Sequence, residues 1–76
     1  MKSMRSHKVE VFRTNVGGMP EAQKLLALLL RHFPDTKINF DLEDCDRILR
    51  VEGKDFAPEK VMRLLQEHGF SCSVLP

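Results

Sequence analysis

The chain has 76 residues, with 12 Lys or Arg and 11 Asp or Glu, so its net charge at neutral pH is +1. A chain of this length forms one domain and buries only about 60% of the surface that its unfolded form exposes, so its apolar residues share one core. The balanced charge argues against a general nucleic-acid-binding surface. No apolar run approaches the ~20 residues of a membrane span, and no apolar signal-peptide core follows the first residues. We therefore expect a cytoplasmic protein that binds neither nucleic acid nor membrane.

The N-terminal residues divide into an arm and a strand. Residues 1–7 mix charged residues, Ser and Met without periodicity. This pattern predicts a flexible N-terminal arm, followed by a single domain over residues 8–76. Residues 8–16 carry β-branched and aromatic side chains and neither Gly nor Pro, which predicts a strand. We expect Phe12 and Val16 to face the core.

The stretch over residues 20–33 has the clearest helical pattern of the chain. Its apolar residues follow the i, i+3, i+4, i+7 spacing of an amphipathic helix, and Pro20 suits the first turn because it has no N–H to satisfy. Gly17 and Gly18 give the backbone the freedom to turn before this helix. Leu28 falls at the edge of the apolar stripe or outside it.

The second half of the chain repeats the alternation of strand and helix. Residues 36–43 alternate apolar and polar side chains, which predicts a strand with one exposed face. Residues 47–52 are its predicted hairpin partner, because the acidic stretch between them is too short for a helix. Pro58 begins a second helix, which Gly69 ends as a left-handed cap. A last short strand is predicted over residues 71–75.

The predicted order is thus strand, helix, strand, strand, helix, strand. Two right-handed crossovers around a central hairpin give an α+β fold, the ferredoxin-like βαββαβ sandwich. We expect a four-stranded antiparallel sheet with both helices on one face.

Two short motifs accompany this element order. Residues 18–24 read Gly-Met-Pro-Glu-Ala-Gln-Lys, and residues 69–72 read Gly-Phe-Ser-Cys. With them the chain resembles the heavy-metal-associated (HMA) domain family of copper chaperones, which carries Gly-Met-Thr-Cys-x-x-Cys and Gly-Tyr-x-Ala at these places. The resemblance covers residues 8–75. It implies the ferredoxin-like fold and a core position for Met19.

The two metal-binding cysteines of that family are replaced here by Glu21 and Lys24. Soft ions such as Cu(I) prefer sulfur ligands. Neither the carboxylate of Glu21 nor the ammonium group of Lys24 can take the place of a thiolate. We expect Glu21 and Lys24 to form a surface ion pair instead. We therefore expect no metal ion and no cofactor at this place.

The remaining chemically active residues favour structural roles. Cys72 is expected to be a buried, inert thiol in a central strand, and Cys45 an exposed one on an acidic hairpin tip. Asp44 and Asp46 beside it lack the Gly and the regular spacing of a calcium loop, so a solvated turn is favoured. The sequence shows no Ser/His/Asp or Cys/His order and no phosphate-binding Gly-rich motif with Lys, so we expect no enzyme.

These observations favour a small non-catalytic binding module that has lost the thiolate metal site and acts through protein contacts. By analogy with HMA chaperones, its partner-binding surface is expected at the loop and the adjoining helix flank, at Gly17, Gly18, Met19, Glu21, Lys24 and Leu28. One alternative is residual copper or zinc binding in an oligomer through non-standard ligands such as Cys45, Cys72 or the His residues. Another is self-association through the outer sheet face, with Val9 and Val11, or through an edge strand.

Overall fold

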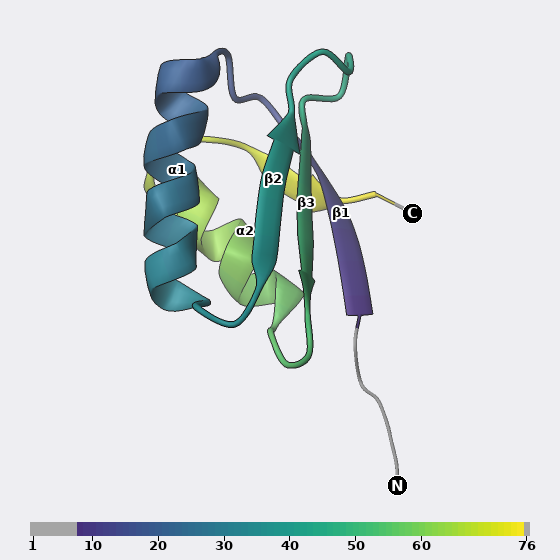
Figure 1. Ribbon diagram of the computed structural model, residues 1–76. Coiled ribbons are helices and arrows are strands. Elements are labelled where there is room, and N and C mark those ends of the chain that lie inside the picture. Colours follow the sequence, from purple (N-terminus) through teal and green to yellow (C-terminus); the bar gives the residue numbers. More distant parts are fainter. Residues whose placement is uncertain (1–7, 76) are drawn as a thin grey trace, which may run out of the picture.

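The computed structural model describes residues 8–75 (Figure 1). The arm predicted over residues 1–7 lies outside the described residues, as does Pro76. The elements follow in the predicted order: β1 (Lys8–Thr14), α1 (Met19–His32), β2 (Lys37–Asp41), β3 (Ile48–Gly53), α2 (Pro58–Glu67) and β4 (Cys72–Val74). No helix among these residues is long and apolar enough to cross a membrane.

The strands form one sheet in the order β2-β3-β1-β4, and every neighbouring pair is antiparallel. Both helices cover the same face of this sheet (Figure 1). The predicted ferredoxin-like α+β sandwich is therefore confirmed. The sheet places β2 and β4 at its two edges.

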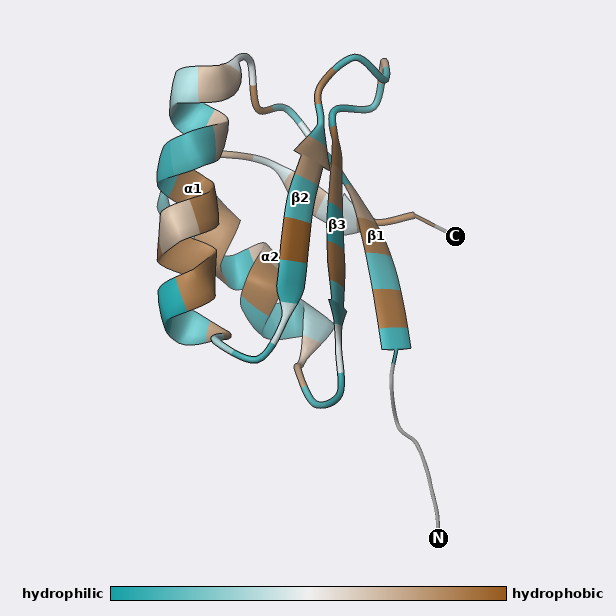
Figure 2. Cartoon of the chain, viewed as in Figure 1, coloured by the Kyte–Doolittle hydropathy of each residue, from teal (hydrophilic) through white to brown (hydrophobic). Residues whose placement is uncertain are grey.

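A single core fills the space between the sheet and the helices. Phe12 and Val16 are fully buried there, as predicted. Alternate residues of the central strands point to the core, and Figure 2 shows the resulting change of hydropathy from residue to residue along the strands. The large side chains that are fully buried are Phe12, Val16, Leu29, Leu49, Val51, Val61 and Leu65.

Strand β1 ends two residues earlier than predicted, because Thr14 bonds to the β2–β3 hairpin. The Thr14 N–H donates to the carbonyl of Asp46 at 3.0 Å, and its hydroxyl donates to the carbonyl of Arg47 at 2.6 Å. The same hydroxyl accepts the Val16 N–H at 3.2 Å. These bonds turn the chain out of the sheet after Thr14 and towards α1.

Helix α2 ends in the left-handed glycine cap that the sequence predicts. Gly69 has φ +88, and its N–H donates to the carbonyl of Gln66 at 3.0 Å. The N–H of Phe70 donates to the carbonyl of Leu65, also at 3.0 Å. This pair of bonds is the Schellman motif, which satisfies the last carbonyls of a helix.

We expect Gly69→Ala to lower the free energy of unfolding by about 1 kcal/mol, because a residue with a Cβ is strained at this backbone conformation. Nothing lies within 4 Å of a Cβ built at Gly69, so strain rather than a clash sets the cost. Gly17→Ala is the matched control, since Gly17 has the same open surroundings without the positive φ. Urea unfolding of both variants measures the difference, and equal losses of stability would contradict the assignment.

Candidate functional site

The loop after β1 leads into the first turn of α1. Gly18 is the N-cap residue of α1 in an extended conformation and provides no side-chain cap. A Cβ built on Gly18 would lie 3.3 Å from Glu21 Oε1, so the Glu21 carboxylate folds back over the start of the helix. The positive end of the helix dipole favours a carboxylate there. An acidic side chain thus occupies the helix end that would otherwise attract an anion.

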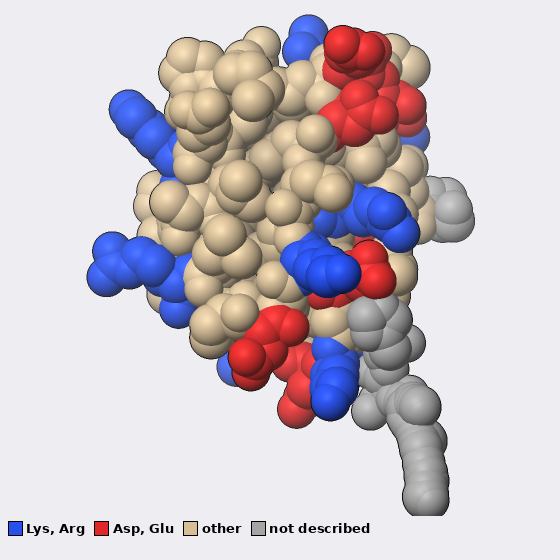
Figure 3. Space-filling view, in the orientation of Figure 1, with Lys and Arg blue, Asp and Glu red and all other residues tan. Residues whose placement is uncertain are grey.

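Helix α1 presents a buried stripe of Ala22, Leu25 and Leu29 to the core and leaves a flank on either side of it. At about 100° per residue, Glu21, Lys24 and Leu28 lie on the flank towards α2, and Met19, Leu26 and Leu30 lie on the flank towards β2. Figure 3 looks onto the second flank and shows a broad area over α1 and towards β2 without charged side chains. The two flanks therefore differ in charge.

The flank towards α2 lines a groove, which we call the α1–α2 groove. Its volume is about 390 Å³, and its lining residues are Glu21, Lys24, Leu25, Leu28, His68 and Phe70. Leu25 is buried at its base, Leu28 and Phe70 are half-buried, and the three polar residues are exposed around it. The His68 ring is oriented by a 2.9 Å contact between its Nδ1 and the carbonyl of Leu64. The groove thus combines an apolar floor with a polar rim.

The structure brings together three of the six residues predicted to bind a partner: Glu21, Lys24 and Leu28. Gly17 and Gly18 shape the loop without lining the groove. His68 and Phe70 were missed, because their approach to α1 depends on how the two helices pack and leaves no signal in the local sequence. Leu28 was predicted at the edge of the core or outside it, and it is half-buried and not part of the core cluster.

The predicted core position of Met19 is wrong, since its side chain is 58% exposed. Met19 is the first residue of α1 and points away from the core stripe, to the flank beside β2. There it borders a separate depression of about 190 Å³ with Ala22, Gln23, Leu26, Asn39 and Phe40. Met19 therefore does not belong to the α1–α2 groove.

The predicted ion pair between Glu21 and Lys24 is also absent. The salt bridges among residues 8–75 join Arg13 to Asp46 at 3.4 Å and Arg50 to Glu52 at 3.8 Å. The Glu21 carboxylate lies instead over the start of α1, as its closeness to Gly18 shows. Lys24 is left on the rim of the α1–α2 groove, where its ammonium group faces solvent.

Two places in the described residues bear on metal binding. Glu21 and Lys24, which the resemblance aligns with the HMA cysteines, offer no sulfur ligand to a soft ion. At the hairpin tip, the ligand atoms of Asp44, Cys45 and Asp46 lie within 4.8 Å of one another. Asp44 Oδ1 accepts the Asp46 N–H at 2.8 Å, and Asp46 Oδ1 lies 3.4 Å from Arg13 Nε. Two of these three ligands are thus already engaged within the protein.

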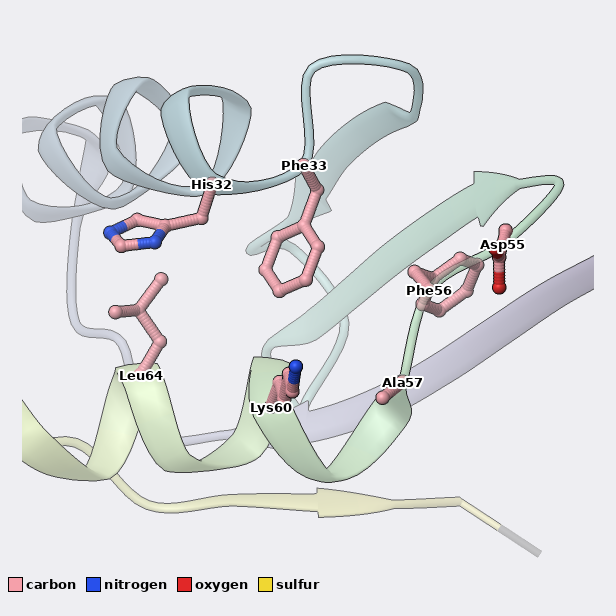
Figure 4. A pocket seen from close by; sticks show the side chains of 7 residues that line it. All are labelled: His32, Phe33, Asp55, Phe56, Ala57, Lys60 and Leu64. Carbon is pink, nitrogen blue, oxygen red and sulfur yellow. The ribbon is translucent and has the colours of Figure 1, made fainter.

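A larger hollow, which the sequence analysis did not predict, lies between the end of α1 and the start of α2. It measures about 480 Å³, and Figure 4 shows His32 and Leu64 facing each other across it while Asp55 points away. The His32 ring contacts the Phe33 ring at a centroid distance of 6.4 Å. Within the part of the chain that the structure describes, no hydrogen bond or ion pair links His32 to Asp55 or Lys60. The interaction of His32 that the structure shows is thus with an aromatic ring and not with a charged group of the hollow.

The two cysteines differ in environment. Cys72 is 5% exposed, and burial raises the pKa of its thiol to about 12. The prediction of a central strand for Cys72 is wrong, because β4 is an edge strand that pairs with β1 alone, yet the side chain still faces the core. Cys45 is exposed at the hairpin tip.

The structure defines a small α+β domain of ferredoxin-like topology with a groove between its helices. No protein-family model, curated protein or solved structure matches the chain. Membership of the HMA family therefore stays a prediction.

We expect DTNB, a thiol reagent, to modify Cys45 rapidly in the folded protein and Cys72 only on unfolding, because the thiolate is the reactive form and burial disfavours it.

The raised pKa of Cys72 also predicts that the stability of the protein depends on pH. Between its ordinary value of 9.0 and about 12, the unfolded chain releases a proton that the folded chain retains. The stabilisation that comes from the Cys72 thiol is therefore fully present below pH 9. Above pH 9 the free energy of unfolding falls as pH rises, by on the order of 1 kcal/mol per pH unit until about pH 12.

Urea unfolding between pH 8 and pH 11 measures this effect, with Cys72→Ala compared against the wild type and Cys45→Ala as the control. The stability difference between wild type and Cys72→Ala should shrink as pH rises. In the DTNB experiment, equal rates of modification of Cys45 and Cys72 in the folded protein would contradict the assignment of Cys72 as a buried thiol.

Proposed function

We propose that the chain is a small, cytoplasmic, non-catalytic protein-binding domain, an HMA-like module without the thiolate metal site. The α1–α2 groove would hold its partner. The observation that carries the proposal is the convergence of Glu21, Lys24 and Leu28 with His68 and Phe70 around one apolar floor. An apolar centre surrounded by a polar rim is the usual composition of protein interfaces.

The groove also suggests the chemistry of the partner. Its half-buried floor residues Leu28 and Phe70 suit a bulky apolar side chain, which gains affinity by leaving water. Lys24 and Glu21 on the rim suit groups of opposite charge on either side of that anchor. A segment with one apolar anchor between an acidic and a basic residue would match both features.

The lining of the groove supports binding rather than catalysis. It contains no hydroxyl or thiol that could act as a nucleophile, and its imidazole is held against a backbone carbonyl. The proposed cytoplasmic location is supported by the cysteines, since an exposed Cys45 and a buried Cys72 both persist as thiols in a reducing compartment.

A peptide selected from a random phage-displayed library against the wild-type domain provides the test. We expect Leu28→Lys to weaken its binding at least about tenfold, because a charge then occupies the apolar floor. Leu30→Lys is the matched control: Leu30 is 39% exposed on the opposite flank of α1, and its substitution should leave the affinity unchanged.

Fluorescence anisotropy measures the affinities, and amide chemical shifts in NMR locate the bound peptide. Selected peptides that shift other surfaces and bind Leu28→Lys as tightly as the wild type would count against the groove as the binding site.

A second candidate function is residual metal binding, which the Asp44, Cys45 and Asp46 cluster favours. Our main proposal predicts no stoichiometric complex with Zn(II) or Cu(I) below about micromolar concentrations, because two of these three ligands have other partners. Anaerobic titration followed by native mass spectrometry tests this, with Cys45→Ser and Cys72→Ser as a matched pair. A tight complex that Cys45→Ser alone abolishes would favour the metal-binding alternative.

A further inference from the structure

Strand β2 forms the longer open edge of the sheet. It has five residues where β4, at the other edge, has three. Its register with β3 is continuous from Lys37 to Asp41, so no bulge interrupts it, and it contains no Pro. Within residues 8–75 no strand pairs with its outer side. Such an edge presents backbone N–H and C=O groups that another extended segment can pair with.

The sequence of β2 is complementary to itself. Residues 37–41 read Lys-Ile-Asn-Phe-Asp. When a second copy is laid antiparallel with Asn39 opposite Asn39, Lys37 of each copy lies opposite Asp41 of the other, and Ile38 lies opposite Phe40. Lys37, Asn39 and Asp41 are exposed on one face of the strand, whereas Ile38 and Phe40 are half-buried on the other. Opposite charges thus meet on the outer face, and apolar side chains meet on the helical face.

Other registers lose this match. A shift of two residues places Lys37 or Asp41 opposite Asn39 and leaves the charges unpaired. A shift of one residue brings exposed positions of one copy opposite half-buried positions of the other, which the pleat of a sheet disfavours. The side chains of β2 therefore select a single arrangement with two-fold symmetry about Asn39.

The flank of α1 beside β2 supports the same arrangement. Continuing the sheet across β2 keeps all helices on one face, so α1 of one copy runs antiparallel to α1 of the other. The two-fold axis brings Met19 at the start of one helix towards Leu30 near the end of the other. Met19 is 58% and Leu30 39% exposed, and Figure 3 shows an area over α1 and towards β2 without charged side chains. Covering such apolar surface favours association.

We propose that two copies of this chain associate through β2, antiparallel about Asn39, into a dimer with one continuous sheet and a second contact between their α1 helices. The contact is isologous and closes on itself, as expected for a homodimer. The dimer contact lies on the opposite side of α1 from the α1–α2 groove. The dimer proposal therefore does not rest on the proposed function, and each of the two proposals can fail without the other.

Charge reversal at the ends of β2 tests the proposal. Lys37→Asp and Asp41→Lys each place like charges opposite each other twice in the dimer, so each should raise the dissociation constant at least about tenfold. An equimolar mixture of the two variants restores opposite charges at both places. We expect this mixture to form a heterodimer with about the wild-type affinity. Sedimentation equilibrium from about 10 µM to about 1 mM gives the affinities, and native mass spectrometry identifies the heterodimer by its mass.

Matched variants separate the two surfaces. Leu30→Lys should weaken the dimer, while Leu28→Lys, on the other flank of α1, should leave it unchanged. Lys37 lies opposite Glu52 within its own sheet, so Lys37→Asp is checked for folding by circular dichroism. Asp41 lies opposite the uncharged Ile48, so Asp41→Lys tests the proposal by itself if Lys37→Asp does not fold. A wild-type chain that stays monomeric at the highest concentration overturns the proposal. A dimer that both charge-reversal variants form as tightly as the wild type also overturns it.

Discussion

Burial of large apolar side chains on one face of the sheet is the constraint on which the rest of this structure depends. Phe12 from β1, Leu49 and Val51 from β3, and Leu29 and Leu65 from the two helices are all completely buried. Each such side chain stabilises the fold by roughly 1.5–3 kcal/mol relative to an exposed position. Exposed ion pairs such as Arg13 with Asp46 contribute at most about 1 kcal/mol. The packing of the helices on the sheet, rather than surface charge, therefore sets where every other group lies.

This constraint leaves α1 with two flanks of different character. Its buried stripe packs in the core, so only the side chains on either side of the stripe are available for other contacts. Glu21 and Lys24 make the flank towards α2 polar, whereas Met19 and Leu30 make the flank towards β2 apolar. Because the two flanks lie on different sides of one helix, the proposed partner at the α1–α2 groove and the proposed second copy at the β2 edge would not displace each other.

The alternation of apolar residues was enough to predict the element order, the sheet and the inward-facing Phe12 and Val16. Features that depend on distant parts of the chain could not be predicted. Thr14 ends β1 by bonding to the carbonyl of Arg47, and nothing in either local sequence signals that contact. A Cβ on Gly53 would lie 2.8 Å from Thr36 Cγ2. This close approach of the two residues likewise arises only once β2 and β3 are paired. Met19 was misplaced because its core position came from a resemblance and not from the helical phase of this chain.

The two motifs that carry the HMA resemblance meet at the same place in the fold. The first provides Glu21 and Lys24 at the rim of the α1–α2 groove, and the second provides Phe70 to the groove directly after the capping residue Gly69. The left-handed backbone of Gly69 directs the chain so that the Phe70 N–H bonds to the carbonyl of Leu65 and its side chain reaches the groove. None of these interactions involves a metal ligand. Glu21 and Lys24 therefore set the charge of the rim, while the glycine cap and the apolar floor set the shape of the groove.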